Sequence, residues 1–200
     1  MKRVLVVLAL AVCSVMNVNA QTAATAPKDS AGTMVEPSKS YDALLKIYEG
    51  EMMGLVKAMP ADKYNFAPSA AIFVPSQKPD YLSPNDKGVR TFGQMVGHVA
   101  QANYFFYGSA SGLKPDVDVK AIGSLTDKDK IVEALQASFE FGHKAIATLT
   151  PQNAFEATKG FPDATRASMV AFGIAHGFDH YGQLAEYLRM NGLVPPASTK

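Results

Sequence analysis

Three of the four histidines in this chain are spaced so that they can bind one metal ion. His176 and His180 lie four residues apart in a helical segment, so their imidazoles share one helix face. His98 lies in a second amphipathic segment, about eighty residues earlier. Imidazole nitrogen is a common ligand of zinc and other divalent metals. The spacing therefore predicts a metal site at His98, His176 and His180.

The hydrophobic pattern assigns these histidines to buried helix faces. His176 and His180 continue a series at three- and four-residue steps that includes Gly173 and Leu184, and His98 follows Met95 by three residues. A core can hold one hydrogen-bonded histidine, but three would each need a partner, and one divalent ion satisfies them together. The alternative is a set of hydrogen-bonded core histidines that bind no metal.

Polar residues beside His180 are candidates for supporting roles. A metal-bound imidazole usually donates its second N–H to an oxygen acceptor, and Asp179 and Gln183 lie within one turn of His180. Asp179 is also the first candidate for a catalytic acid or base, ahead of Tyr104 and Tyr181. A solvent-exposed polar residue is the alternative interpretation of Asp179, whereas Gln183 lies on the inner face.

Other metal sites lack residues that they require. A zincin protease helix needs His-Glu-x-x-His, but Gly177 occupies the glutamate position. A di-iron carboxylate bundle needs two Glu-x-x-His motifs, and Glu140 and His143 supply one. We therefore expect His143 to lie outside the metal site, at the surface or the edge of the core.

The first twenty residues are typical of a secretory signal peptide. Lys2 and Arg3 precede an apolar run too short to span a bilayer, and Val18-Asn19-Ala20 is a cleavage signal. We expect residues 1–20 to be removed and the protein to be periplasmic or secreted, without a stable membrane anchor. The only cysteine, Cys13, lies in this segment and would be removed with it, so the mature chain has no thiolate for catalysis or zinc binding.

The charge of the mature chain excludes one large class of partner. Removal of Lys2 and Arg3 changes the formal net charge from +1 to −1, and no cluster of lysine and arginine remains. Such a domain is a poor candidate for binding nucleic acid. The expected partners are a small-molecule substrate and, as an option that no residue pattern selects, a second copy of the chain in a homodimer.

Four amphipathic segments must position the histidines. Residues 21–39 form an expected flexible leader, and the domain is expected over residues 40–196. The connection at 61–90 is interrupted by prolines, yet it is apolar enough to pack over one end of the domain. No convincing β pattern is present, so the prediction is an all-α four-helix bundle with long connections. The predicted helices are residues 40–59, 91–108, 126–149 and 163–190.

The chain resembles the DinB/YfiT-like metalloenzymes. The resemblance lies in the segments Thr91 to His98 and His176 to Leu184, in a C-terminal block from Tyr187 to Pro196, and in Lys63 to Pro68. It implies a four-helix bundle with a three-histidine site, one ligand from the second helix and two from the fourth, which correspond to His98, His176 and His180. It also implies zinc or nickel as the metal. Some relatives transfer small cellular thiols, whereas the signal peptide marks this chain as an exported member.

Three nitrogen ligands with open coordination positions are typical of a catalytic site rather than a structural one. The leading hypothesis is therefore a metal-dependent hydrolase or group-transfer enzyme that acts on a small molecule. The alternative is a noncatalytic exported protein that binds a metal or a small ligand.

Overall fold

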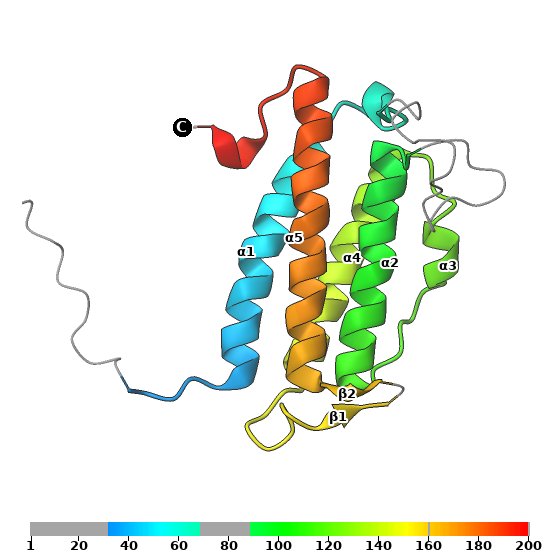
Figure 1. Ribbon diagram of the computed structural model, residues 1–200. Coiled ribbons are helices and arrows are strands. Elements are labelled where there is room, and N and C mark those ends of the chain that lie inside the picture. Colours follow the sequence, from blue (N-terminus) through cyan, green and yellow to red (C-terminus); the bar gives the residue numbers. More distant parts are fainter. Residues whose placement is uncertain (1–31, 69–88, 160, 200) are drawn as a thin grey trace, which may run out of the picture. The chain divides into compact units, whose positions relative to one another are not determined.

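Four long α-helices form the domain (Figure 1). The computed structural model describes residues 32–68, 89–159 and 161–199. The helices are α1 (Pro37–Ala58), α2 (Phe92–Ser111), α4 (Lys128–Ile146) and α5 (Arg166–Met190). They confirm the predicted all-α class. The expected signal peptide 1–20, most of the expected leader and the central part of the 61–90 connection lie outside the described residues.

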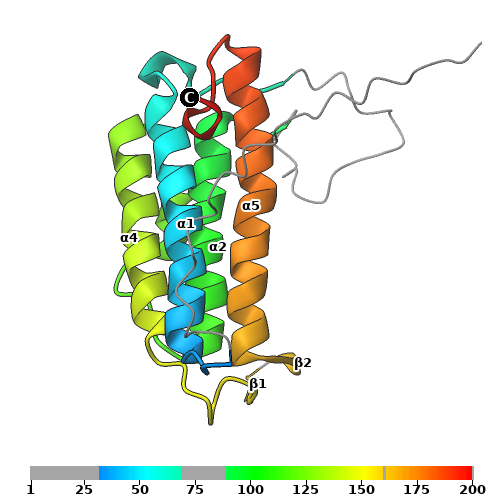
Figure 2. The same cartoon turned by 90° about the vertical axis from the view of Figure 1, so that its left-hand side faces the viewer.

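The helices are arranged as a bundle in which α1 and α2 each contact both α4 and α5. Figure 2 shows α1 between α4 and α5, with α2 behind it. Both α2 and α4 begin where α1 ends, since Phe92 N donates to Phe66 O at 2.8 Å and Lys128 Nζ donates to Met59 O at 2.8 Å. α5 runs in the opposite direction, and the hydroxyl of Tyr187 near its end donates to Arg90 O at 3.0 Å. Hence α2 and α5 are antiparallel neighbours.

α2 begins with a capping box. Thr91 Oγ1 accepts from Gln94 N at 3.2 Å, and Gln94 Oε1 accepts from Thr91 N at 2.8 Å, so two otherwise unpaired N–H groups are satisfied. The predicted end at Gly108 is wrong because the helix continues to Ser111. Gly112 ends it in the left-handed conformation, with a φ of 78° that glycine adopts without strain.

The other helix boundaries differ from the predictions by a few residues. α1 begins at Pro37, inside the expected leader, because a proline is well suited to the first turn of a helix. α4 begins after Asp127, whose side chain accepts from Lys130 N, rather than at the predicted residue 126. A short helix, α3 (Val119–Ile122), lies within the predicted loop after α2 and is capped by Asp118.

A small β-hairpin corrects the expectation that the chain has no strand. β1 (Ala157–Thr158) pairs antiparallel with β2 (Phe161–Thr165), at the end of the bundle where α5 begins (Figure 1). Two residues of β1 are too few to show an alternating pattern. β2 also occupies the start of the predicted last helix, so α5 begins at Arg166, after the Thr165 cap.

Glycines let aromatic rings enter the bundle between the helices. The ring of Tyr48 is fully buried between Phe139 and Phe178, at centroid distances of 5.0 and 5.3 Å. A Cβ atom added at Gly177 would lie 2.1 Å from Tyr48 Cζ, so α5 can pass this ring only because residue 177 has no side chain. None of the helices in the described part of the chain combines the length and apolar character that crossing a membrane requires.

Candidate metal centre

The three predicted histidines meet between α2 and α5. His98 lies in the second turn of α2, and His176 and His180 lie one turn apart in the middle of α5. One ligand nitrogen from each of the three imidazoles lies within 4.8 Å of the other two. The ring centroid of His98 is 5.3 Å from that of His176 and 4.9 Å from that of His180. Two antiparallel helices therefore bring the three imidazoles together at one point.

The two histidines of α5 already have the separation that a shared ion requires. Their Nε2 atoms are 3.1 Å apart, whereas nitrogens at about 2.1 Å from a tetrahedral zinc would be about 3.4 Å apart. The donor set fits a metal ion because it consists of three nitrogen ligands, all held by helices.

Burial favours the neutral form of all three imidazoles. Burial, followed by the positive charge of Arg90 and of the neighbouring imidazoles, lowers the pKa of His98 to about 4. Burial likewise lowers the pKa of His176 and of His180, although the nearby charge of Asp179 opposes the shift. Since a metal binds the neutral imidazole, protons compete little for these ligands near pH 7.

The comparison with known families agrees with this geometry. A model of the DinB superfamily matches residues 45–184 of the chain. The chain belongs to the DinB superfamily. All three histidines lie inside the matched region, and their arrangement fits a DinB-type metal site. A comparison with functionally curated proteins finds no match to this chain.

Gln183 connects the DinB site to Asp179. His180 is buried, with 7% of its surface exposed, and its Nδ1 lies 3.3 Å from Gln183 Oε1. The amide nitrogen of Gln183 in turn donates to Asp179 Oδ2 at 2.9 Å. Because the Asp179 carboxylate accepts from Nε2 of Gln183, the amide oxygen of Gln183 is directed toward the His180 imidazole. The Nδ1–H of His180 can then donate to that oxygen, which leaves the Nε2 lone pair for a metal.

The three acid/base candidates lie in different surroundings. The carboxylate of Asp179 is exposed and contacts Gln183. Tyr104 is buried against Phe141 of α4, at a ring distance of 5.1 Å, and Tyr181 lies 6.3 Å from Phe178. Of the three, Asp179 alone is linked through a described hydrogen bond to a side chain that contacts a site histidine.

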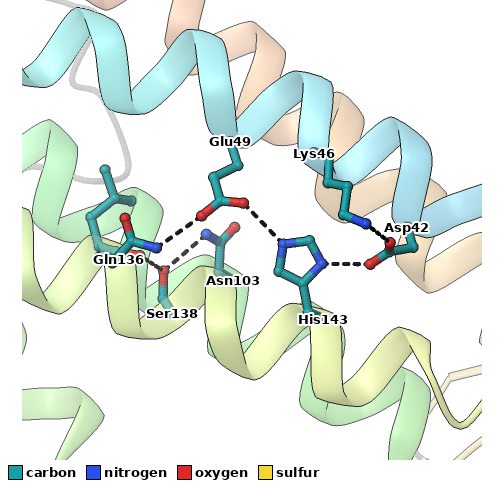
Figure 3. A network of polar contacts seen from close by, with 8 residues as sticks. Asp42, Lys46, Glu49, Asn103, Gln136, Ser138 and His143 are labelled. Atoms are coloured by element: carbon teal, nitrogen blue, oxygen red, sulfur yellow. Dashed lines mark hydrogen bonds and ion pairs between the residues drawn. The ribbon is translucent and has the colours of Figure 1, made fainter.

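His143 lies outside the DinB site, as expected from its isolated motif. It is located on α4, where Nδ1 contacts Asp42 at 2.5 Å and Nε2 contacts Glu49 at 2.9 Å, both on α1. Figure 3 shows this imidazole between the two carboxylates, with Lys46 between Glu49 and Asp42 on α1 and in contact with Asp42. These contacts connect α1 to α4 and give His143 a structural environment of its own.

Two features of the site escaped the sequence reasoning. Arg90 ends the long connection, and its positive charge lowers the pKa of all three site histidines. Phe106 of α2 packs against the ring of His176, with centroids 5.2 Å apart. Arg90 precedes the Thr91 cap and lies outside the helix, so the period of the helix did not indicate that its charge acts on the site.

Proposed function

We propose that this DinB protein is a metal-dependent hydrolase or group-transfer enzyme that acts on a small molecule at His98, His176 and His180. The observation that carries the proposal is the convergence of three imidazoles, two of them only partly buried, between α2 and α5. Three protein ligands leave coordination positions for a substrate. A divalent ion, zinc or nickel, would polarise a carbonyl or phosphoryl oxygen there.

Side chains around the histidines have separate roles in this proposal. Gln183 orients the His180 ring through Nδ1, and Asp179 holds the amide of Gln183. The exposed Asp179 carboxylate is also the candidate that exchanges a proton with substrate. The positive charge of Arg90, which acts on all three imidazoles, favours a substrate whose reacting group is negatively polarised.

Metal analysis and titration test the ligand set. Protein purified without chelators should contain about one zinc or nickel ion per chain, and calorimetric titration should show that His180→Ala abolishes stoichiometric binding. His143→Gln is the matched control, because His143 contacts Asp42 and Glu49 instead. Unchanged metal affinity in the His180→Ala variant would show that the three histidines are not the ligands.

Turnover assays separate catalysis from binding. Metal-loaded protein is assayed on panels of esters, amides, lactones and phosphoesters, and His176→Ala should lose the activity that the wild type shows. Equal activity in both proteins would reject the metal mechanism. The second candidate, a noncatalytic metal- or ligand-binding protein, is favoured by the engagement of Asp179 with Gln183. Tight binding of a small ligand without turnover would support it.

We also propose that the protein is exported to the periplasm or beyond. The support is the basic start, the short apolar run and the small residues before Gln21. N-terminal sequencing of native protein should begin at Gln21. Cytoplasmic protein with Met1 intact, or a lipid on Cys13, would contradict the proposal.

A further inference from the structure

A row of four phenylalanines extends from the metal centre toward the β-hairpin. Phe106 lies between His176 and Phe172, with ring centroids 5.2 and 5.1 Å away. Phe105 lies 5.2 Å from Phe106 and 5.8 Å from Phe161 of β2. We call Phe105, Phe106, Phe161 and Phe172 the aromatic strip. Each ring touches the next, and the series ends at a metal-ligand candidate.

Most of the aromatic strip faces solvent. Phe172, Phe105 and Phe161 are 59%, 51% and 40% exposed, whereas Phe106 is 8% exposed and anchors the row. Single exposed apolar residues are common on proteins, but a contiguous group of large apolar side chains is typical of a binding surface. The strip lies where α2, α5 and the hairpin meet, and this end of the bundle is seen in Figure 1.

The strip and the histidines are in line along the two helices. Phe172 precedes His176 by four residues on α5, and Phe106 of the antiparallel α2 contacts the His176 ring. Four residues of helix span about 6 Å. A molecule whose reacting group is at the imidazoles would therefore extend an aromatic ring, on a linker of a few atoms, over the strip.

We propose that the aromatic strip is the specificity surface of this site and binds the uncharged aromatic tail of its small-molecule substrate. The inference rests on the proposed function for the location of the reacting group. The strip is continuous with His176 through Phe106, and its four side chains carry no charge or hydrogen-bonding group. The exposed edges and faces of these phenylalanine rings can pack against another aromatic ring in edge-to-face or offset-stacked geometry.

Two metal-binding probes that differ in their tails test the proposal. Acetohydroxamate and 3-phenylpropanohydroxamate bind zinc through the same group, and calorimetry on the zinc-loaded full chain gives both Kd values. The phenyl probe should bind at least about tenfold more tightly to the wild type. Phe172→Ala and Phe105→Ala should each lower this preference at least about threefold.

Phe155→Ala is the matched control. Phe155 is 81% exposed but does not belong to the strip, so both Kd values should stay at the wild-type level. Far-UV circular dichroism and zinc stoichiometry verify that the strip variants are folded. If the wild type binds zinc but does not prefer the phenyl probe, or if the strip variants retain the preference, the strip proposal is wrong and the metal site stands.

Two further measurements distinguish the remaining outcomes. If no zinc binds, the proposed function fails, and NMR of the metal-free protein with 3-phenylpropanohydroxamate tests the strip alone: shifts of the Phe105 and Phe172 ring signals support it, and unshifted signals overturn it. Sedimentation velocity, which measures the oligomeric state, tests whether a second copy of the chain covers the strip. A wild-type dimer that Phe172→Ala converts to a monomer would overturn the substrate proposal.

Discussion

Gln183 shows how one side chain can determine the chemistry of a neighbouring imidazole. Its amide contacts His180 Nδ1 at 3.3 Å and Asp179 Oδ2 at 2.9 Å, so both of its ends are engaged. The carboxylate fixes which end faces His180. Since a neutral imidazole has one donor and one acceptor nitrogen, a hydrogen bond at Nδ1 determines that Nε2 is the acceptor.

Loss of this orientation should weaken metal binding. Gln183→Leu removes the acceptor for His180 Nδ1, and we expect the zinc affinity to fall about 10- to 100-fold. Calorimetric titration measures the change, with the exposed Gln152→Leu as control. A Gln183→Leu protein with wild-type affinity would show that the contact does not orient the ligand.

At the scale of elements, α5 approaches α1 closely because of Gly177. A Cβ there would meet the buried Tyr48 ring at 2.1 Å, and this ring is held by Phe139 and Phe178. We expect Gly177→Ala to lower the free energy of unfolding by about 1 to 3 kcal/mol. The measurement is denaturant unfolding followed by circular dichroism.

Gly182→Ala supplies the matched comparison on the same helix. A Cβ at Gly182 meets nothing within 4 Å, so this change should stabilise the helix by up to about 1 kcal/mol. Equal effects of the two substitutions would contradict the steric explanation. The same contact explains why residue 177 does not accommodate the glutamate of a zincin motif.

His143 makes the contact between α4 and α1 dependent on pH. Partial burial on its own lowers its pKa, but hydrogen bonds and charges from Glu49 and Asp42 outweigh this effect, so the pKa lies above the ordinary value of 6.5. Burial likewise opposes the shift of Asp42, yet Lys46 and His143 hold its pKa below 3.8. The stabilisation from His143 is complete below pH 6.5 and is lost as the pH rises through its folded-state pKa. The contribution of Asp42 is lost at low pH.

The variant His143→Gln should therefore lose more stability at pH 5.5 than at pH 9. We expect the difference between wild type and variant to be larger at pH 5.5 by on the order of 1 kcal/mol, since the groups are partly exposed. Comparing the proteins at each pH cancels the opposite contribution of His98, His176 and His180, whose pKa values are lowered. If the stability difference between wild type and His143→Gln is the same at pH 5.5 and at pH 9, the His143 contact carries no charge.

For the whole molecule, metal binding and folding should be linked without being identical. The core of the four helices consists of buried apolar side chains such as Leu45, Phe92 and Leu135, which need no ion. The metal-free protein should therefore keep its helix content. Zinc at 100 times its Kd should add about 2.7 kcal/mol and raise the Tm by roughly 5 to 10 °C.

Thermal melting with and without EDTA measures this shift. The variant His98→Ala should show no zinc-dependent increase, because it lacks one ligand. Complete unfolding of the wild type in EDTA at 25 °C would instead identify a structural metal, whose binding energy is folding energy.

Local patterns in the sequence were sufficient for the helices and for the histidines. The period of apolar residues, the capping box of Thr91 and Gln94, and the spacing of His176 and His180 each depend on contacts within a few residues. The missed boundaries were also local: Thr165 and Ser168 form a capping box with serine in place of glutamate or glutamine, and Gly112 ends α2 where Gly108 does not.

The tertiary structure decided what depends on distant residues. It placed His98 beside His176 and His180, His143 between Asp42 and Glu49, and Phe161 beside Phe105. Helical phase shows which face a residue occupies, but not the level at which a second helix passes it. That level is determined by packing, as where Gly177 admits the ring of Tyr48. The residues of the site could therefore be predicted from the sequence, whereas the side chains that surround them were established only by the tertiary structure.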